Sequence, residues 1–183
     1  ALSHQLIDLA SAPASNSFLT EDQLNEPEVS YPLKLFVCDA CFLVQTDEYK
    51  KSTEIFNAEY LYFSSFSKTW LDHAKDYVGM MVERFGYDQR NRVIEIASND
   101  GYLLQYFKER GIPVLGIEPA AGTAAAAEQK GIETIVEFFG KALAKRLAGQ
   151  DRKADLLIGN NVLAHVPDLN DFVKGLKMAL KAD

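Results

Sequence analysis

The sequence predicts an α/β fold in which helices cover both faces of a parallel sheet. From residue 93 onward, short apolar segments rich in β-branched residues alternate with helical segments. Glycine follows most of the helical segments, and small or polar residues follow most of the apolar ones. Strands that alternate with helices in this way form a parallel sheet, because each crossover returns the chain to the same edge.

The apolar segment that starts at Val93 indicates where a ligand binds. It reads Val-Ile-Glu-Ile-Ala-Ser-Asn-Asp-Gly, a buried strand followed by a turn of small residues, and a helical pattern begins at Tyr102. A strand, a tight turn and a helix N-terminus together bind nucleotide-like ligands in α/β sheets. The next expected strand, 113–118, ends in Glu118, whose carboxylate can accept hydrogen bonds from both hydroxyls of a ribose.

The remaining elements of this region alternate regularly. The expected helices are 102–110, 121–130, 141–148 and a last helix through residue 180, and the later strands are 132–136 and 155–159. Asp168 is the expected N-cap of the last helix. All of the expected strands end at one edge of the sheet, because they are parallel.

An amphipathic helix is expected over 69–85, before the sheet. Apolar residues recur at steps of three and four, and Gly86 ends the pattern. The expected core face comprises Trp70, Ala74, Tyr77, Met81 and Phe85, flanked by Leu71, Val78 and Val82. His73 stands among charged residues and is expected to face solvent.

The N-terminal region is expected to be rich in loops, with short strands at 5–9 and 33–37. Cys38 and Cys41 follow the second of these strands in a Cys-x-x-Cys pattern, which is half of a zinc ribbon. These are the only cysteines, so three alternatives stay open. The pair is an incomplete zinc site, or a second chain or a histidine such as His4 or His73 completes the site, or the pair is redox-active.

Composition excludes several classes of protein. The 183 residues are 48% hydrophobic, which supports a packed core and excludes a disordered chain. The net charge of −7, with no long basic run, argues against a nucleic-acid partner. No apolar run is long enough for a membrane span, and residues 1–10 do not resemble a signal peptide, so we expect a cytoplasmic protein without a membrane partner.

Four sequence strings resemble the S-adenosylmethionine (SAM)-dependent sugar C-methyltransferases. The strings are Glu-Ile-Ala-Ser-Asn-Asp-Gly-Tyr-Leu-Leu from residue 95, Gly-Ile-Glu-Pro-Ala-Ala from 116, Val-Glu-Phe-Phe-Gly from 136 and Asn-Asn-Val-Leu-Ala-His-Val-Pro-Asp from 160. The first has the spacing of the E-x-G-x-G-x-G loop of class I methyltransferases, with Ala97 and Asn99 in place of two glycines. This family acts on nucleotide-linked 4-keto-6-deoxysugars.

The resemblance implies a domain organisation. Residues 1–54 are the zinc-binding-like segment, 55–86 an aromatic connector with a helix, and 87–183 a Rossmann-like SAM domain limited to its first four strands. The family has a further C-terminal domain that follows the SAM domain. Strand 155–159 is therefore expected to have an open edge that pairs with the rest of a longer protein or allows self-association.

The resemblance also implies a cofactor site. The methionine end of SAM is assigned to the turn and to the asparagines after the fourth strand, the ribose to Glu118, and the adenine to apolar and aromatic residues. The cofactor-binding candidates are Ala97, Ser98, Asn99, Gly101, Ile117, Glu118, Pro119, Phe138, Phe139, Asn160 and Asn161. Alternatively, the two phenylalanines belong to the core and the two asparagines only form a turn.

Three further residues are candidates for contact with the substrate. Tyr60 and Tyr62 lie in an aromatic segment that the resemblance places beside the SAM and sugar pockets, and His165 follows the fourth strand. The implied reaction removes the proton on C3 of the sugar, forms an enolate and methylates C3. In the family, the candidate base lies in a Tyr-x-Glu-His segment, so His165 is expected to orient the substrate. A SAM-binding module without activity and an NAD-dependent oxidoreductase are the alternatives.

Overall fold

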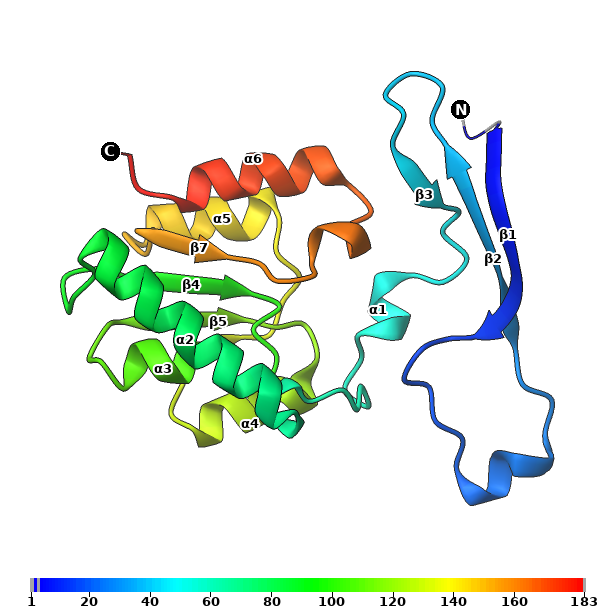
Figure 1. Ribbon diagram of the computed structural model, residues 1–183, viewed down its shortest axis with the longest axis horizontal. Coiled ribbons are helices and arrows are strands. Elements are labelled where there is room, and N and C mark those ends of the chain that lie inside the picture. The colour runs from blue at the N-terminus through cyan, green and yellow to red at the C-terminus, as the bar shows by residue number, and fades with distance from the viewer. Residues whose placement is uncertain (1, 3, 183) are drawn as a thin grey trace. The chain divides into compact units, whose positions relative to one another are not determined.

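A computed structural model describes residue 2 and residues 4–182, and the chain divides into two compact units (Figure 1). We call residues 1–55 the N-terminal unit and residues 56–183 the C-terminal unit. Among the described residues, no helix combines the length and the apolar character that crossing a membrane requires.

The N-terminal unit is a three-stranded antiparallel sheet. Its elements are β1 (His4–Pro13), the short 3-10 helix η1 (Glu21–Asn25), β2 (Ser30–Val37), β3 (Val44–Thr46) and the one-turn helix α1 (Ser52–Ile55). The strand order is β1-β2-β3, and the β1–β2 register shifts twice. The first strand is longer than the expected 5–9, because pairing with β2 holds residues that have no apolar alternation of their own. No described residue of this unit is buried.

The C-terminal unit contains the predicted parallel sheet with helices on both faces. Its strands are β4 (Val93–Ile96), β5 (Val114–Ile117), β6 (Thr134–Ile135) and β7 (Leu156–Ile158), in the order β6-β5-β4-β7. Its helices are α2 (Lys68–Phe85), α3 (Leu104–Lys108), α4 (Ala121–Gln129), α5 (Lys141–Gly149) and α6 (Leu169–Ala179), with 3-10 turns η2 (Ser64–Phe66) and η3 (Leu163–His165). The predicted order of elements is therefore confirmed.

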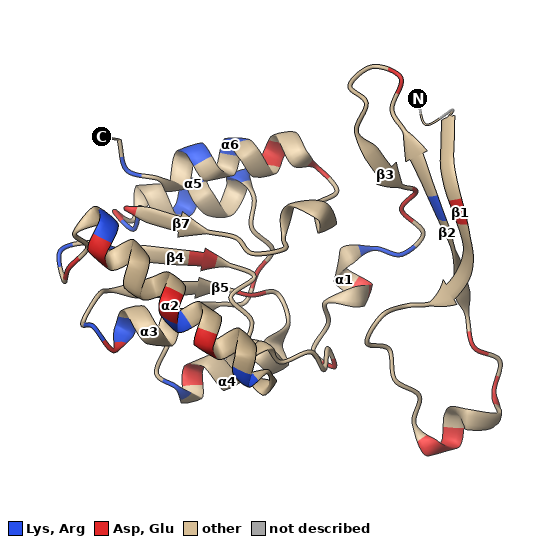
Figure 2. Cartoon of the chain, viewed as in Figure 1, with Lys and Arg blue, Asp and Glu red and all other residues tan. Residues whose placement is uncertain are grey.

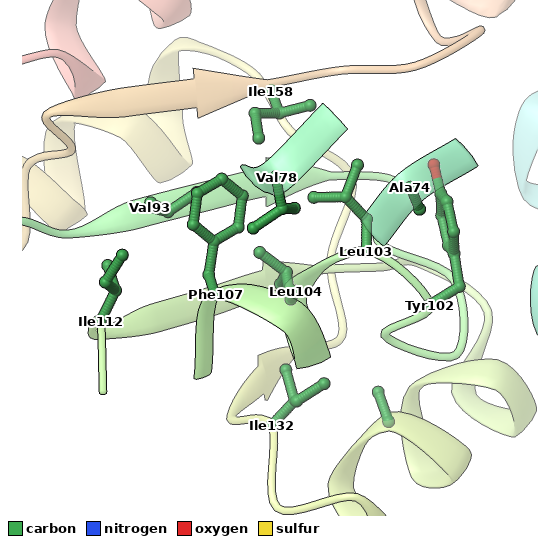
Figure 3. Close-up of a cluster of buried hydrophobic side chains, with 11 residues drawn as sticks. Ala74, Val78, Val93, Tyr102, Leu103, Leu104, Phe107, Ile112, Ile132 and Ile158 are labelled. Carbon is green, nitrogen blue, oxygen red and sulfur yellow. The ribbon is translucent and has the colours of Figure 1, made fainter. Parts of the chain in front are cut away.

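Two apolar clusters form the core, one on each face of the sheet. The first packs side chains of α2 and α3 onto the sheet around Phe107, as Figure 3 shows. The second packs α5 and α6 onto the other face around Ile94 and Ile117. Adjacent residues Val93 and Ile94 belong to different clusters, as the alternation of side chains along a strand requires.

Helix α2 begins and ends where the sequence indicates. The Ser67 side chain accepts a hydrogen bond from the backbone of Trp70, and Gly86 ends the helix in the left-handed conformation with φ 65°. The prediction that Phe85 lies on the core face was wrong, because its position in the last turn leaves it 53% exposed. At the start of α6, Asp168 is the N-cap and accepts from the backbone of Asp171, as predicted.

Strand β7 pairs with β4 in parallel. Just before β7, Ala154 forms an isolated parallel bridge with Leu180, and the backbone amide of Lys181 donates to the Ala154 carbonyl at 2.9 Å. The residues that follow α6 therefore run alongside the chain at the entry to β7.

Candidate functional site

The turn after β4 has an unusual backbone. Ala97, Asn99 and Gly101 have φ values of 53°, 51° and 74°, so the left-handed conformation recurs at alternate positions. These are the three positions that the methyltransferase loop fills with glycine, which adopts this conformation without strain. Gly101 also has little room for a side chain, because a Cβ there would overlap Cδ1 of Ile132 and lie 3.3 Å from Cβ of Ala127. Ala97 and Asn99 therefore stand at positions whose backbone conformation favours glycine.

Glu118 connects this loop to the helix that follows β5. Its side chain is buried, and its two oxygens accept hydrogen bonds from the backbone amides of Asn99 and Ala120, each at 2.9 Å. Burial raises the pKa of Glu118, and these amides act against that shift. The carboxylate predicted to bind a ribose therefore lies directly beside the loop in this structure.

Buried polar atoms without a hydrogen-bond partner gather in the same segment. Within the part of the chain that the structure describes, they are both carboxylate oxygens of Glu95, Oγ of Ser98 and Oδ1 of Asp100. Burial raises the pKa of Glu95 well above its usual range. Buried polar groups are normally paired in native proteins, so this concentration at one loop indicates a site for ligand or ordered water.

Acidic groups outnumber basic ones around the loop. Glu95, Asp100 and Glu118 are 0%, 3% and 3% exposed, and the acidic residue of β4 is visible in Figure 2. The nearby cation is Lys130, whose Nζ lies 3.2 Å from Oδ2 of Asp100. Burial favours the neutral form of Glu95, so Asp100 and Glu118 are the carboxyl groups that favour a ligand with positive charge.

The asparagines after β7 lie at the same edge of the sheet. Nδ2 of Asn160 donates to the hydroxyl of Tyr102 at 3.0 Å, which connects the end of β7 to the residue that follows the loop. Asn161 has a left-handed backbone with φ 55°, and both asparagines are exposed. Asn160 is thus joined to the loop region, while Asn161 shapes the turn.

The residues predicted to surround the adenine divide into two groups. Ile117 is fully buried in the second core cluster, and Phe139 packs edge-on against Phe172 with ring centroids 5.4 Å apart. Pro119 is half-buried, and Phe138 is 43% exposed. The last two therefore have side-chain surface available to a ligand, whereas the first two contribute mainly to packing.

The predicted substrate-contacting residues form one aromatic group. The ring of Phe56 lies 5.2 Å from that of Tyr60 and 6.1 Å from that of His165, and Tyr60 lies 6.5 Å from Tyr62. Burial, and to a smaller extent the charge of Glu118, raises the pKa of Tyr60. The structure thus brings Tyr60, Tyr62 and His165 together near the end of β5.

Sequence reasoning missed several residues of this region. Phe56 connects the tyrosines to His165, and Ser65 and Lys130 bind Asp100. Phe56 lies in the aromatic segment that also contains the two tyrosines, so the sequence offered a reason to consider it. Asp100 lies inside the loop that resembles the methyltransferase motif. Nothing in the sequence marks Lys130, which is thirty positions from its partner.

The candidate metal ligands lie in the N-terminal unit. Cys38 is half-buried, Cys41 is exposed, and both are free thiols. Backbone amides of Cys41 and Ala40 lower the pKa of the Cys38 thiol, which favours the thiolate that a metal requires. His4 pairs with Asp39, with Nε2 and Oδ1 2.8 Å apart. Across residue 2 and residues 4–182, no three His, Cys, Asp or Glu residues are grouped so that they could hold a metal ion.

Two family profiles match the chain. One, described as "Methyltransferase domain", matches residues 70–183, and the other, described as "Putative zinc binding domain", matches residues 1–56.

Curated relatives were also found. The C-methyltransferase NovU of Streptomyces niveus is 28% identical over 178 residues, which cover 97% of this chain and 42% of the relative. A ubiquinone biosynthesis O-methyltransferase of Azorhizobium caulinodans is 25% identical over 103 residues, covering 52% of this chain and 41% of the relative. The chain therefore spans about two-fifths of the length of these relatives.

A solved structure has the same fold as the C-terminal unit. It is described as a putative S-adenosyl-L-methionine-dependent methyltransferase from Methanococcus maripaludis and is 14% identical, with a TM-score of 0.51. The match covers 65% of this chain and 56% of that one. Together with the methyltransferase profile, it confirms the predicted Rossmann-like sheet.

Proposed function

We propose that this chain is the cofactor-binding part of a SAM-dependent C-methyltransferase. The chain belongs to the methyltransferase family whose profile matches residues 70–183. The proposed reaction methylates C3 of a nucleotide-linked 4-keto-6-deoxysugar. One observation carries the proposal: the loop after β4 is left-handed at all three glycine positions of the methyltransferase motif, and the acid at the end of β5 lies beside it. The 28% identity to a C-methyltransferase over 97% of the chain supports carbon as the atom that accepts the methyl group.

The charge of the site fits this cofactor. SAM carries an ammonium and a sulfonium against one carboxylate, and Asp100 and Glu118 lie beside the loop with Lys130 as the nearby cation. When bound, SAM supplies an electrophilic methyl group. The loop also does not fit the G-x-G-x-x-G spacing by which NAD enzymes approach the pyrophosphate. The oxidoreductase alternative is weaker for this reason.

Each part of the site then has a binding role. Backbone groups of Ala97–Gly101 and the amide of Asn160 would hold the methionine end, and Glu118 would accept from the ribose hydroxyls. In this structure the two Glu118 oxygens accept from backbone amides, so ribose binding would add to those bonds or replace them. Phe138 and Pro119 offer the accessible apolar surface for the adenine.

The tyrosines and His165 would face the sugar. The 4-keto group acidifies the C3 proton, and an enolate forms when a base removes that proton. The resemblance assigns this base to a Tyr-x-Glu-His segment, which the 183 residues do not contain. We therefore give His165 an orienting role, and precise placement of donor and acceptor is the main contribution expected from this part of the protein.

Two measurements test the proposal. Calorimetric titration with S-adenosylhomocysteine (SAH) and with NAD should give binding for SAH alone. Tighter binding of NAD would contradict the proposal. Incubation with methyl-labelled SAM and a 4-keto-6-deoxysugar nucleotide then separates an active enzyme from a binding module, because only the enzyme releases labelled sugar. Mass spectrometry of that product should place the label on C3.

A further inference from the structure

The asparagine that replaces the second loop glycine forms two hydrogen bonds with a distant segment. We call residues 56–66 the aromatic strap. Oδ1 of Asn99 accepts from the backbone amide of Ser64 at 2.8 Å, and Nδ2 donates to the carbonyl of Tyr62 at 2.9 Å. Asn99 is 7% exposed and so is Ser64, which shields these bonds from water. A glycine would satisfy the backbone at this position but would form neither bond.

A second contact fixes the next residue of the strap. The hydroxyl of Ser65 donates to Oδ2 of Asp100 and accepts from Nζ of Lys130 at 2.7 Å. The same Nζ donates to the backbone carbonyl of Asp100 at 2.7 Å. Ser65, Asp100 and Lys130 thus form a closed group that includes a carboxylate and an ammonium, and charge-assisted hydrogen bonds of this kind are the strong ones.

The strap then passes across the edge of the sheet where the cofactor is expected. It approaches the first turn of α4 so closely that a Cβ on Gly122 would lie 2.9 Å from the carbonyl oxygen of Ala58. The charge of Glu118 contributes to the raised pKa of Tyr60, and Phe56 contacts the ring of His165. The strap therefore reaches both the end of β5 and the turn after β7.

We infer that Asn99 and the Ser65–Asp100–Lys130 group are positioning residues, which hold the aromatic strap against the cofactor loop so that Tyr60 and Tyr62 cover bound cofactor. This inference rests on the proposed function for its ligand. The anchoring itself is a property of the protein alone. It also gives a physical reason for the departure from the glycine motif, because asparagine tolerates the left-handed conformation and adds the anchor.

Amide exchange of Ser64, followed by NMR, tests the anchoring without any ligand. The acceptor of this amide is the Asn99 side chain, so Asn99→Gly should increase its exchange by about 10- to 100-fold. Ala97→Gly is the matched control, since it changes another left-handed position of the same loop and removes no bond to the strap. Unchanged exchange of Ser64 in Asn99→Gly would overturn the inference.

Calorimetry with SAH tests the effect on cofactor binding and uses one variant that lacks the hydroxyl of residue 65 and one that keeps it. Ser65→Ala should weaken binding of SAH by about 3- to 10-fold, because it removes the hydroxyl that joins Asp100 and Lys130. Ser65→Thr keeps the hydroxyl and should restore the affinity. Equal affinities of Ser65→Ala and the unsubstituted chain would overturn the role of the strap in binding.

The two experiments separate the inference from the proposed function. If the unsubstituted chain binds no SAH, the proposed function fails, and the Ser64 exchange still decides whether Asn99 anchors the strap. If SAH binds and Asn99→Gly leaves Ser64 protected, the proposed function stands and the inference fails. Faster exchange of the Ser64 amide in Asn99→Gly, together with restored SAH affinity in Ser65→Thr, supports both the inference and the proposed function.

Discussion

The two units of this chain are stabilised in different ways. The C-terminal unit has two clusters of buried side chains, and Phe107, Ile94 and Leu147 in them are completely inaccessible. The N-terminal unit has a sheet of similar strand number, yet none of its described residues is buried, and Phe18 and Phe42 are 71% and 76% exposed. Regular hydrogen bonding is thus present in both units, whereas a core is present in one.

The absence of buried residues among those described leads us to expect that the N-terminal unit needs a stabiliser besides backbone pairing. Hydrogen bonds between strands contribute little net free energy, because unfolded strands bind water instead. Small sheets without a core usually depend on a metal, a disulfide or a partner surface. The free thiols of Cys38 and Cys41 and the match of residues 1–56 to a zinc-binding profile agree with this explanation.

The largest expected difference between the units is in the response to loss of a phenylalanine ring. Phe107→Ala should lower the free energy of unfolding of the C-terminal unit by about 3–5 kcal/mol, because it leaves a cavity in a closed core. Phe18→Ala removes the same ring from an exposed site and should change the free energy by less than about 0.5 kcal/mol. Trp70, the single tryptophan, reports urea unfolding of the C-terminal unit by fluorescence, and amide exchange of residues 4–55 reports the N-terminal unit.

The second-largest expected difference between the units is in their response to the cofactor. Glu118→Ala should weaken binding of SAH by about 10- to 100-fold, since a carboxylate–ribose contact contributes about 1.5–3 kcal/mol. Glu133→Ala is the matched control, because Glu133 is an exposed acid that precedes β6 and pairs with Arg152. Amide exchange should slow on addition of SAH in residues 56–183 and stay unchanged in residues 4–55. Equal affinities of the two variants, with the fold intact, would show that the acid does not bind the cofactor.

The sequence predicted the C-terminal unit far better than the N-terminal one, for a physical reason. A buried strand such as Val93–Ile96 and a helix with one apolar face such as Lys68–Phe85 leave patterns that follow from burial itself. Strand β1 is exposed along almost its whole length, so no alternation marks it, and only its pairing with β2 defines its ten residues. Where nothing is buried, periodicity carries no information.

The candidate site was predictable only in part. The loop after β4 and Glu118 could be placed from strand ends and motif spacing, because parallel strands end at one edge. The orientation and hydrogen-bond partners of individual side chains could not be predicted in this way. Ile117 and Phe139 turned inward, and the amide of Asn99 bonded to the strap, because tertiary packing decides which face of a turn is filled. Their roles in binding stay predictions.

The buried acids Glu95 and Glu118 of the C-terminal unit and the exposed acid Asp8 of the N-terminal unit should contribute pH dependences of opposite sign. Burial raises the pKa of Glu95 and Glu118, so these two groups bind more protons in the folded state than in the unfolded chain, and their contribution to stability should be lost as the pH rises above the usual range of a carboxyl group. The backbone amide of Ala10, together with Lys34, lowers the pKa of Asp8. That contribution to the N-terminal unit is present above the usual pKa and is lost as the pH falls through the lowered one.

Substitution of Glu95, which is fully buried, isolates its contribution to the loss of stability with rising pH. Glu95→Gln removes the titration, so the urea midpoint from Trp70 fluorescence should fall less between pH 5 and pH 8 than in the unsubstituted chain. Asp8→Asn should leave the Trp70 curve unchanged at every pH, because Asp8 belongs to the other unit. An equal fall in Glu95→Gln and the unsubstituted chain would contradict the assignment of this titration to Glu95.

The smallest expected effect comes from two alanines with the same unfavourable backbone. Ala97 in the cofactor loop has φ 53°, and Ala10 in β1 has φ 66°. The left-handed conformation costs an alanine about 1–2 kcal/mol, and glycine loses about 0.5–1 kcal/mol more chain entropy on folding, so each change to glycine should stabilise its own unit by about 0.5 kcal/mol. Ala97→Gly should therefore raise the Trp70 urea midpoint slightly, whereas Ala10→Gly should not move it. If Ala97→Gly and Ala10→Gly shift the Trp70 midpoint equally, the two units unfold as one. The exposed sheet would then share the stability of the core and would not depend on a stabiliser of its own.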